Sequence, residues 1–240
     1  MTSWATAGPN SLTRREVEPG RLEVVTRVIA GAAGGRRLQV PPGNGTRPTS
    51  DRAREGLFAS VMSEFGSLAG VHVMDLYAGS GALGIEALSR GAASVLLVES
   101  DARAAAVVKA NVKTVGLPGA TVATDRVERL LARPQTGRRR ADLVFADPPY
   151  AVTSEAVADM LTALGDGWLG DGALVVVERA TRSGAFDWPP GYEEGKSRRY
   201  GEATFWYGWY GSGAEAGQAA QPQTAVPRPS LDAPRRAHEE

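Results

Sequence analysis

The most informative stretch of this sequence is Asp147-Pro148-Pro149-Tyr150, which follows the predicted strand Asp142–Ala146. Two consecutive prolines fix φ near about −65° and cannot continue the interior of a strand or a helix. They therefore hold Asp147 and Tyr150 rigidly at the carboxyl end of a predicted strand, and open α/β sheets bind ligands at that edge. A plain turn with a capping aspartate is the alternative interpretation.

The chemistry that suits this turn is methylation of the exocyclic amine of a nucleobase. The nitrogen lone pair of such an amine is delocalised into the ring, so the amine is a poor nucleophile. If the Asp147 carboxylate and a neighbouring carbonyl, such as that of Pro148, accept both N–H hydrogens, the lone pair becomes available. Tyr150 can stack on the base, after it has left its own stack, for about 1–3 kcal/mol. We predict that Asp147, Pro148 and Tyr150 are catalytic and that Asp147 is ionised with an ordinary pKa.

A glycine-rich turn further upstream predicts a cofactor site. Gly79, Gly81 and Gly84 stand in the order G-x-G-x-x-G, and Glu99 ends the next predicted strand twenty residues after Gly79. Glycines allow a close approach of the backbone to a ligand, and an acidic residue at that distance can bind ribose hydroxyls. Because Asp75 precedes the first glycine by four residues, it would meet no pyrophosphate but could face an ammonium. This favours S-adenosylmethionine over NAD, although a tight turn without a ligand has the same spacing.

A further acidic residue, Asp125, follows the third strand of the predicted sheet. A carboxylate there could accept a hydrogen bond from an adenine amino group, or it could cap the helix that begins near Val127. The predicted cofactor-binding residues are Asp75, Tyr77, Gly79, Ser80, Gly81, Glu99, Asp125 and Arg126.

The composition excludes several classes of protein. The 240 residues include no Cys and two His, with 27 basic residues against 27 acidic ones. Without Cys there is no thiolate metal site, and no Cys adduct of the kind that methylation of a pyrimidine C5 needs; we therefore predict no metal. No apolar run approaches the ~18 residues of a membrane helix and no secretory signal is readable, so we expect a soluble cytoplasmic protein that does not bind membranes.

The zero net charge hides a local excess of arginine. Between Arg21 and Arg54, seven basic residues against two acidic ones give a charge of +5. Positive patches of this kind attract phosphate backbones. Because the chain has only three lysines, a general preference for arginine is an alternative explanation.

Alternating strands and helices must position these residues. The predicted strands are Val71–Leu76, Val95–Glu99, Thr121–Thr124, Asp142–Ala146 and Ala173–Glu178, with a terminal antiparallel pair at Lys196–Tyr200 and Ala203–Trp209. The helices between them are Ala82–Arg90, Ala102–Val115, Val127–Arg133 and Ser154–Leu164. Short apolar strands separated by helices indicate a parallel α/β sheet covered on both faces.

In front of the sheet, the sequence predicts a small extension. Val24–Ala30 and Arg36–Val40 flank a glycine-rich turn and predict a hairpin. A helix follows Pro48, with Thr49 or Ser50 as its N-cap and an apolar stripe at helical spacing. The predicted organisation is a disordered segment at 1–22, the extension at 23–66, the α/β domain at 67–210 and a disordered tail at 211–240.

The motifs together resemble a known family. DLYAGSGALGIEA at 75–87, followed by DPPY, is similar to the Rossmann-like, S-adenosylmethionine-dependent amino-methyltransferases. Residues 27–31 and 35–38 and, above all, the run RPTSDRARE at 47–55 resemble the RsmD-like small-subunit rRNA guanine-N2 methyltransferases. The resemblance covers roughly residues 26 to 210, and the RPTSDRARE run is far more specific than the glycine turn. Tyr150 stands where relatives often have Phe, which preserves stacking.

The resemblance implies a Rossmann-like fold with a seven-stranded, mostly parallel sheet, helices on both faces and a hairpin-plus-helix extension in front. It implies transfer of a methyl group from S-adenosylmethionine to N2 of one guanine, at position 966, of 16S rRNA. The partner would be this rRNA within the 30S subunit or its assembly intermediate. Asp75, Gly79, Ser80 and Gly81 match the family's cofactor loop, Glu99 its ribose ligand and Asp125 its adenine ligand, and Asp147, Pro148 and Tyr150 match its catalytic turn. The predicted RNA-binding residues are Arg36, Arg37, Arg47, Arg52 and Arg54.

Three other functions remain open from the residues. A DNA or other nucleic-acid amino-methyltransferase acting on adenine N6 or cytosine N4 could use DPPY equally well, but such DNA enzymes usually carry a sizeable target-recognition domain. An NAD-dependent oxidoreductase would need an acid for hydride transfer, and no histidine is evidently placed for it. A non-catalytic RNA-binding module would have no use for an intact DPPY turn.

Overall fold

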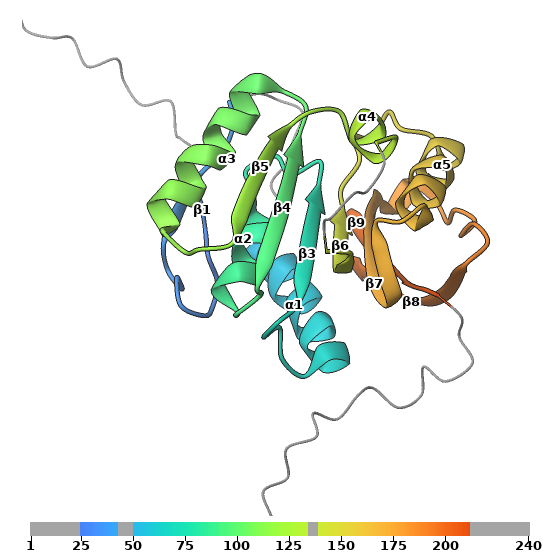
Figure 1. The fold of residues 1–240 in the computed structure, drawn as a ribbon, viewed down its shortest axis with the longest axis horizontal. Helices are drawn as coiled ribbons and strands as arrows, with labels where there is room; N and C mark the ends of the chain where they lie inside the picture. Colours follow the sequence, from blue (N-terminus) through green and yellow to red (C-terminus); the bar gives the residue numbers. More distant parts are fainter. Residues whose placement is uncertain (1–24, 43–49, 134–138, 212–240) are drawn as a thin grey trace, which may run out of the picture.

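The computed structural model describes residues 25–42, 50–133 and 139–211 (Figure 1). The segment 1–22, the tail beyond residue 211, Arg47 and Thr49 lie outside the described residues. The predictions made for them and the proposed domain boundaries therefore stay predictions.

The elements follow one another as a hairpin, a helix and then alternating strands and helices. The strands are β1 Val25–Arg27, β2 Arg37–Gln39, β3 His72–Leu76, β4 Ser94–Glu99, β5 Ala120–Thr124, β6 Ala141–Ala146, β7 Leu169–Ala180, β8 Tyr192–Tyr200 and β9 Ala203–Tyr210. The helices are α1 Asp51–Phe65, α2 Ala82–Ser89, α3 Ala102–Val115, α4 Val127–Leu131 and α5 Ser154–Gly165, with a 3-10 turn at Thr181–Ser183.

The main sheet has seven strands in the order β5-β4-β3-β6-β7-β9-β8. The first five are parallel to one another, and β9 is antiparallel to both of its neighbours, β7 and β8. This confirms the predicted Rossmann-like, mostly parallel α/β sheet. β7 begins earlier than predicted, because Leu169 pairs with Ala141 before a register shift. The prediction started the strand at Ala173, since Asp171 and Gly172 interrupt the apolar pattern.

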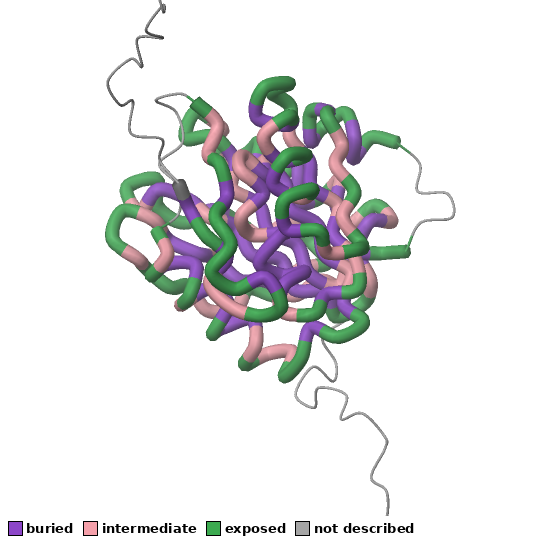
Figure 2. The backbone as a smooth tube through the Cα atoms, turned by 90° about the vertical axis from the view of Figure 1, so that its left-hand side faces the viewer, coloured by how far each residue is buried: buried purple, intermediate pink, exposed green. Residues whose placement is uncertain are grey.

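Helices cover both faces of this sheet, as predicted. Alternate residues of a strand point to opposite faces: Val73 and Phe145 pack in one core with α1, α2, α3 and the hairpin, and Met74 and Val144 pack in the other with α4 and α5. Figure 2 shows the buried backbone gathered at the centre of the molecule and the exposed segments around it.

The N-terminal hairpin of β1 and β2 is fastened to the helices of the first face. Buried Glu86 on α2 accepts the N–H groups of Ile29 at 2.6 Å and Ala30 at 3.0 Å. Asn111 on α3 accepts the Gln39 N–H at 2.8 Å and donates to the Gln39 carbonyl at 2.9 Å and the Ser80 carbonyl at 2.8 Å. Asn111 therefore joins the extension to the glycine-rich loop.

Helix α1 begins as predicted. The Ser50 hydroxyl accepts the N–H of Ala53 at 3.2 Å, which satisfies one of the free donors at the helix start. Its buried stripe includes Leu57, Phe58 and Val61. Across the three described ranges, no helix is both long and apolar enough to span a membrane.

Candidate active site

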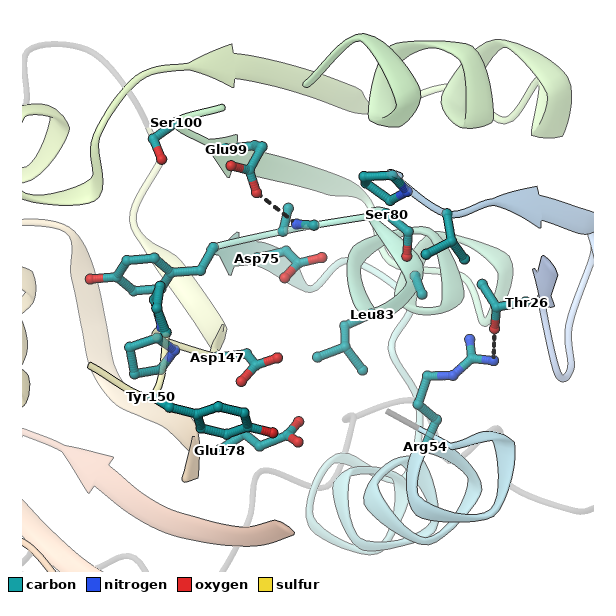
Figure 3. Close-up of a pocket in the computed structure, with 18 residues that line it drawn as sticks. Thr26, Arg54, Asp75, Ser80, Leu83, Glu99, Ser100, Asp147, Tyr150 and Glu178 are labelled. Atoms are coloured by element: carbon teal, nitrogen blue, oxygen red, sulfur yellow. Dashed lines mark hydrogen bonds between the residues drawn. The ribbon is translucent and has the colours of Figure 1, made fainter. Parts of the chain in front are cut away.

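A cavity of about 320 Å³ opens at the carboxyl ends of β3, β4 and β6 (Figure 3). From β3 the chain continues through β4 to β5 on one side of the sheet, and β6 then lies on the other side of β3. Open α/β sheets bind ligands at such a switch point. The volume is in the range of small-molecule sites. The predicted site residues that line the cavity are Asp75, Tyr77, Gly79, Ser80, Glu99, Asp147, Pro148, Tyr150 and Arg54.

Asp75 is held inside the cavity by the third glycine of the loop. Its side chain is buried, and Oδ2 accepts the Gly84 N–H at 2.8 Å. A Cβ on Gly84 would lie 2.8 Å from Val95 and 3.1 Å from that oxygen, so a larger residue would push α2 away from β3 and β4. Burial raises the pKa of Asp75 to about 7, against the Gly84 hydrogen bond, and the charge of Glu99 adds to the rise. A bound cation would favour the ionised form.

Glu99, at the end of β4, supports the first glycine of the loop. Its Oε2 accepts the Gly79 N–H at 2.9 Å, and Oε1 accepts the Asp101 N–H at 2.8 Å. Gly79 and Gly81 have φ angles of 56° and 77°, which glycine adopts without strain. Gly81 does not line the cavity but caps α2. Because each carboxylate oxygen has a second lone pair, Glu99 can still accept from ligand hydroxyls.

Tyr77, between Asp75 and the glycines, has a positive φ of 61°. Backbone of this kind is uncommon for a residue with a side chain and clusters at functional sites. Its hydroxyl donates to Glu128 at 3.3 Å. The loop is thus bent sharply at the point where it borders the cavity.

Besides Glu99, three carboxyl groups converge on the cavity. Asp147 follows β6, and Glu178 lies at the same level on β7, because Ala146 pairs with Val177. In Figure 3 the carboxyl groups of Asp75, Asp147 and Glu178 point into the same space. Burial raises the pKa of Asp147 well above its ordinary value, and the charges of Glu178 and Asp75 raise it further. The expectation of an ordinary Asp147 pKa is therefore wrong, because it took no account of burial or of these two neighbours.

Tyr150 lies at the mouth of the cavity, with 61% of its surface exposed. The guanidinium carbon of Arg182 is 5.9 Å from the centre of its ring. A second, larger hollow of about 690 Å³ shares Tyr150 and Glu178 with the first and is also lined by Arg52 and Arg199. Tyr150 and Glu178 therefore border both the cofactor cavity and a hollow with exposed arginines.

Asp125 and Arg126 do not line the cavity. The Asp125 carboxylate accepts the Arg126 N–H at 2.8 Å and forms close ion pairs with the side chains of Arg129 and Arg133. Burial acts to raise the Asp125 pKa, but the hydrogen bonds and charges of these groups outweigh it and lower the pKa. Because Asp125 already has these partners and does not line the cavity, its predicted role in adenine binding stays a prediction.

The predicted RNA-binding arginines separate into two groups. Arg36 donates to the carbonyls of Thr114 at 2.8 Å and Val115 at 2.9 Å, at the end of α3. Arg54 is 1% exposed, and its Nη2 donates to the Thr26 hydroxyl at 2.7 Å. Arg36 nevertheless remains exposed, whereas Arg54 lines the cavity and its Nε and Nη1 have no hydrogen-bond partner among the described residues. The RNA-binding roles of both stay predictions.

Arg37 and Arg52 are exposed and stay candidates for RNA binding, whereas Arg47 lies outside the described residues. Glu178, Arg182 and Arg199 were not predicted as site residues. A signal for Glu178 existed, because it ends the predicted strand Ala173–Glu178 beside the strand that leads into Asp147.

Comparisons with known proteins agree with this geometry. The family description "Conserved hypothetical protein 95" matches residues 26–209. The protein named "Ribosomal RNA small subunit methyltransferase D" from Escherichia coli is 38% identical over 162 residues, which are 66% of this chain and 76% of that protein. The solved structure of yhhF from Escherichia coli has a TM-score of 0.68 at 30% identity and covers 78% of this chain and 98% of its own.

The same fold occurs in a more distant solved structure. Magnesium protoporphyrin IX methyltransferase from Synechocystis, with S-adenosylmethionine bound, has a TM-score of 0.52 at 14% identity, over 66% of this chain and 78% of its own. The sheet order and the cavity at its switch point define the class of Rossmann-like α/β methyltransferases. Within that class, the chain belongs to the "Conserved hypothetical protein 95" family of RsmD-like methyltransferases.

Proposed function

We propose that this protein transfers a methyl group from S-adenosylmethionine to the N2 amine of one guanine of 16S rRNA, at the position equivalent to 966. The substrate would be the 30S subunit or its assembly intermediate. The observation that carries the proposal is the position of Asp147, inside a cavity that the glycine-rich loop also borders. The printed name of the Escherichia coli relative supports small-subunit rRNA as the substrate.

The donor groups in the cavity suit S-adenosylmethionine. This molecule has ribose hydroxyls, which need acceptors, and an ammonium and a sulfonium, which need negative charge. Glu99 provides a carboxylate beside the loop for the hydroxyls, and buried Asp75 provides one for the ammonium. A dinucleotide would instead bring a pyrophosphate close to several carboxylates, which disfavours an NAD-dependent enzyme.

We propose that the enzyme accelerates methyl transfer mainly by positioning the target amine. When bound, S-adenosylmethionine would supply a methyl carbon on a sulfonium: the nitrogen–carbon bond forms as the carbon–sulfur bond breaks, the neutral thioether leaves and the extra amine proton passes to water. Asp147 and the Pro148 carbonyl hold the two N–H groups, which aims the lone pair and favours attack. A positive ligand beside Asp147 would restore its ionised, hydrogen-bond-accepting form against the burial that raises its pKa.

The RNA would approach over the exposed edge of the site. The Tyr150 ring, 61% exposed, can stack on a base that has left its own stack. Exposed Arg182 lies over that ring, and exposed Arg52 and Arg199 line the hollow beside it. These three side chains can contact flanking phosphates. Recognition of a folded RNA by shape suits an enzyme with a small extension in front of its catalytic domain.

The test is a side-by-side transfer assay with methyl-labelled S-adenosylmethionine. The acceptors are duplex DNA, bare 16S rRNA and 30S subunits from a strain that lacks this protein, with Asp147→Ala as the control for background. We expect label in the small-subunit RNA samples and none in DNA. Label in DNA alone would support the DNA amino-methyltransferase instead.

A further inference from the structure

We propose that Glu178 makes the enzyme selective for guanine by accepting the N1–H of the target base, while Asp147 holds the neighbouring amine. This inference deepens the proposed function and rests on it. It adds a specificity residue that the DPPY turn by itself does not provide.

The sheet places these two carboxylates side by side. β6 and β7 are parallel neighbours, and the pairs Phe145–Val176 and Ala146–Val177 fix their register. Asp147 and Glu178 are each one residue beyond the last pair. Phe145 and Val176, two residues before them on their strands, share the core on the α1–α2–α3 face, and side chains two residues apart point to the same face. Both carboxyl groups line the cavity. The charge of Glu178 adds to the burial that raises the pKa of Asp147, and the charges of both add to the burial that raises the pKa of Tyr150.

Glu178 also lies where the base must enter. It borders both the cofactor cavity and the hollow lined by Arg52 and Arg199. Figure 3 shows its side chain next to the Tyr150 ring, with the carboxyl group on the same side as that of Asp147. A base stacked on Tyr150 with its amine at Asp147 would therefore have its adjoining edge near Glu178.

The hydrogen-bond pattern of two adjacent acceptors matches guanine. Guanine carries an N1–H donor directly beside its N2 amine. In adenine and cytosine, the ring nitrogen beside the exocyclic amine is an acceptor, and its lone pair would face the lone pairs of a carboxylate. A second carboxylate beside the one that holds the amine thus accepts guanine and rejects the other two bases, because a buried acceptor would be left facing an acceptor.

The base analogue 2-aminopurine tests this contact, because it keeps the amine at C2 but has an unprotonated N1. Since it also lacks the O6 oxygen of guanine, the change in its use between the wild-type protein and the Glu178 variants reports the N1–H contact. We would reconstitute 30S subunits with 16S rRNA that carries either guanine or 2-aminopurine at the target position and measure kcat/KM for methyl transfer to each. The wild-type protein should prefer guanine by roughly 10- to 100-fold, the range for a lost hydrogen bond to a charged group.

Substitution of Glu178 should change this preference rather than the overall rate alone. In Glu178→Ala, guanine should lose most of its advantage, whereas 2-aminopurine, whose N1 no longer faces a carboxylate, should be methylated at least as fast as by the wild-type protein. In Glu178→Gln, the amide can either accept or donate, so 2-aminopurine should gain relative to guanine. Glu202→Ala, which removes a charge from the second hollow but not from the cofactor cavity, should leave the ratio unchanged.

The outcomes separate this inference from the proposed function. An equal fall for both substrates in Glu178→Ala, with no gain for 2-aminopurine in Glu178→Gln, would assign Glu178 a structural role and overturn the inference alone. A wild-type protein that methylates both substrates equally would also overturn it. If the wild-type protein forms N6-methyladenosine or N4-methylcytidine and no N2-methylguanosine, the proposed function itself is wrong.

Discussion

The Asp75 carboxylate and the Gly84 amide are joined by a 2.8 Å hydrogen bond inside the cofactor cavity. This bond connects the end of β3 to the first turn of α2 and keeps a buried carboxyl group next to the glycine-rich loop. Burial raises its pKa to about 7, so a large fraction of it is neutral near neutral pH. The group is therefore arranged to become charged when a cation binds.

Cofactor affinity should consequently depend on pH. Ionised Asp75 attracts the ammonium, and protonated Asp75 does not, so S-adenosylmethionine should bind fully above pH 7 and lose affinity as pH falls through about 7. One such group weakens binding by at most about tenfold for each further pH unit. Calorimetry on both sides of pH 7 measures this. Affinity that stays constant or rises as pH falls would refute the role of Asp75.

Substitutions of Asp147 separate an acceptor from a base. Asp147→Ala should nearly abolish methylation and leave cofactor affinity within a few-fold, since it removes the group that holds the amine. Asp147→Asn should keep part of the rate, because its amide oxygen still accepts a hydrogen bond. Single-turnover kinetics with saturating cofactor measures both. If the Asn variant is as inactive as the Ala variant, Asp147 acts as a base.

The exposed ring of Tyr150 should contribute through stacking. Tyr150→Phe keeps the aromatic face and should change methylation little. Tyr150→Ala should weaken productive RNA binding by about 1–3 kcal/mol, which is the range for a stacked base. The expected result is a rise in KM for RNA without a comparable change in cofactor affinity. A Phe variant as impaired as the Ala variant would point to the hydroxyl instead of the ring.

Arg54 and Arg52, two residues apart on α1, should give opposite phenotypes. Arg54 donates to Thr26 at 2.7 Å, the Arg27 carbonyl at 2.9 Å and Asp51 at 2.7 Å. Arg54→Met should lower the free energy of unfolding by about 1–3 kcal/mol, because buried acceptors lose their donor. Arg52→Met, at an exposed position, should leave stability almost unchanged and weaken RNA binding, with a smaller salt dependence.

Urea unfolding and RNA-binding titrations at several salt concentrations compare the two variants. Reversed phenotypes, with Arg54 important only for RNA and Arg52 only for stability, would contradict the structural assignment.

The different outcomes for these arginines show what could be predicted from sequence. Arg54 precedes Leu57, Phe58 and Val61 by three, four and seven residues, so helical spacing alone would have placed it on the buried stripe. Arg36 offers no such signal, because its partners at the end of α3 are 78 and 79 residues away in the chain. Composition identified a cluster of positive charge but could not say which charges face solvent.

The proposed catalytic turn at residues 147–150 was predictable because its signal is local in the sequence. Asp147, Pro148 and Tyr150 lie next to one another in the sequence, and two prolines fix their backbone locally. The raised pKa of Asp147 depends instead on burial and on the charges of Glu178 and Asp75, which come from two other strands and meet it only in the folded sheet. Local motifs therefore located the residues of the candidate site, and the register of β3, β6 and β7 determines the electrostatics of that site.

The most direct test of the central claim is mass spectrometry of 16S rRNA nucleosides. The rRNA would come from a strain that lacks this protein, before and after incubation of its 30S subunits with the purified enzyme and S-adenosylmethionine. We predict that N2-methylguanosine at one position appears with the wild-type protein and is absent with Asp147→Ala. Methylation of an adenine or cytosine amine, or an unchanged nucleoside profile, would contradict transfer to a guanine held by Asp147.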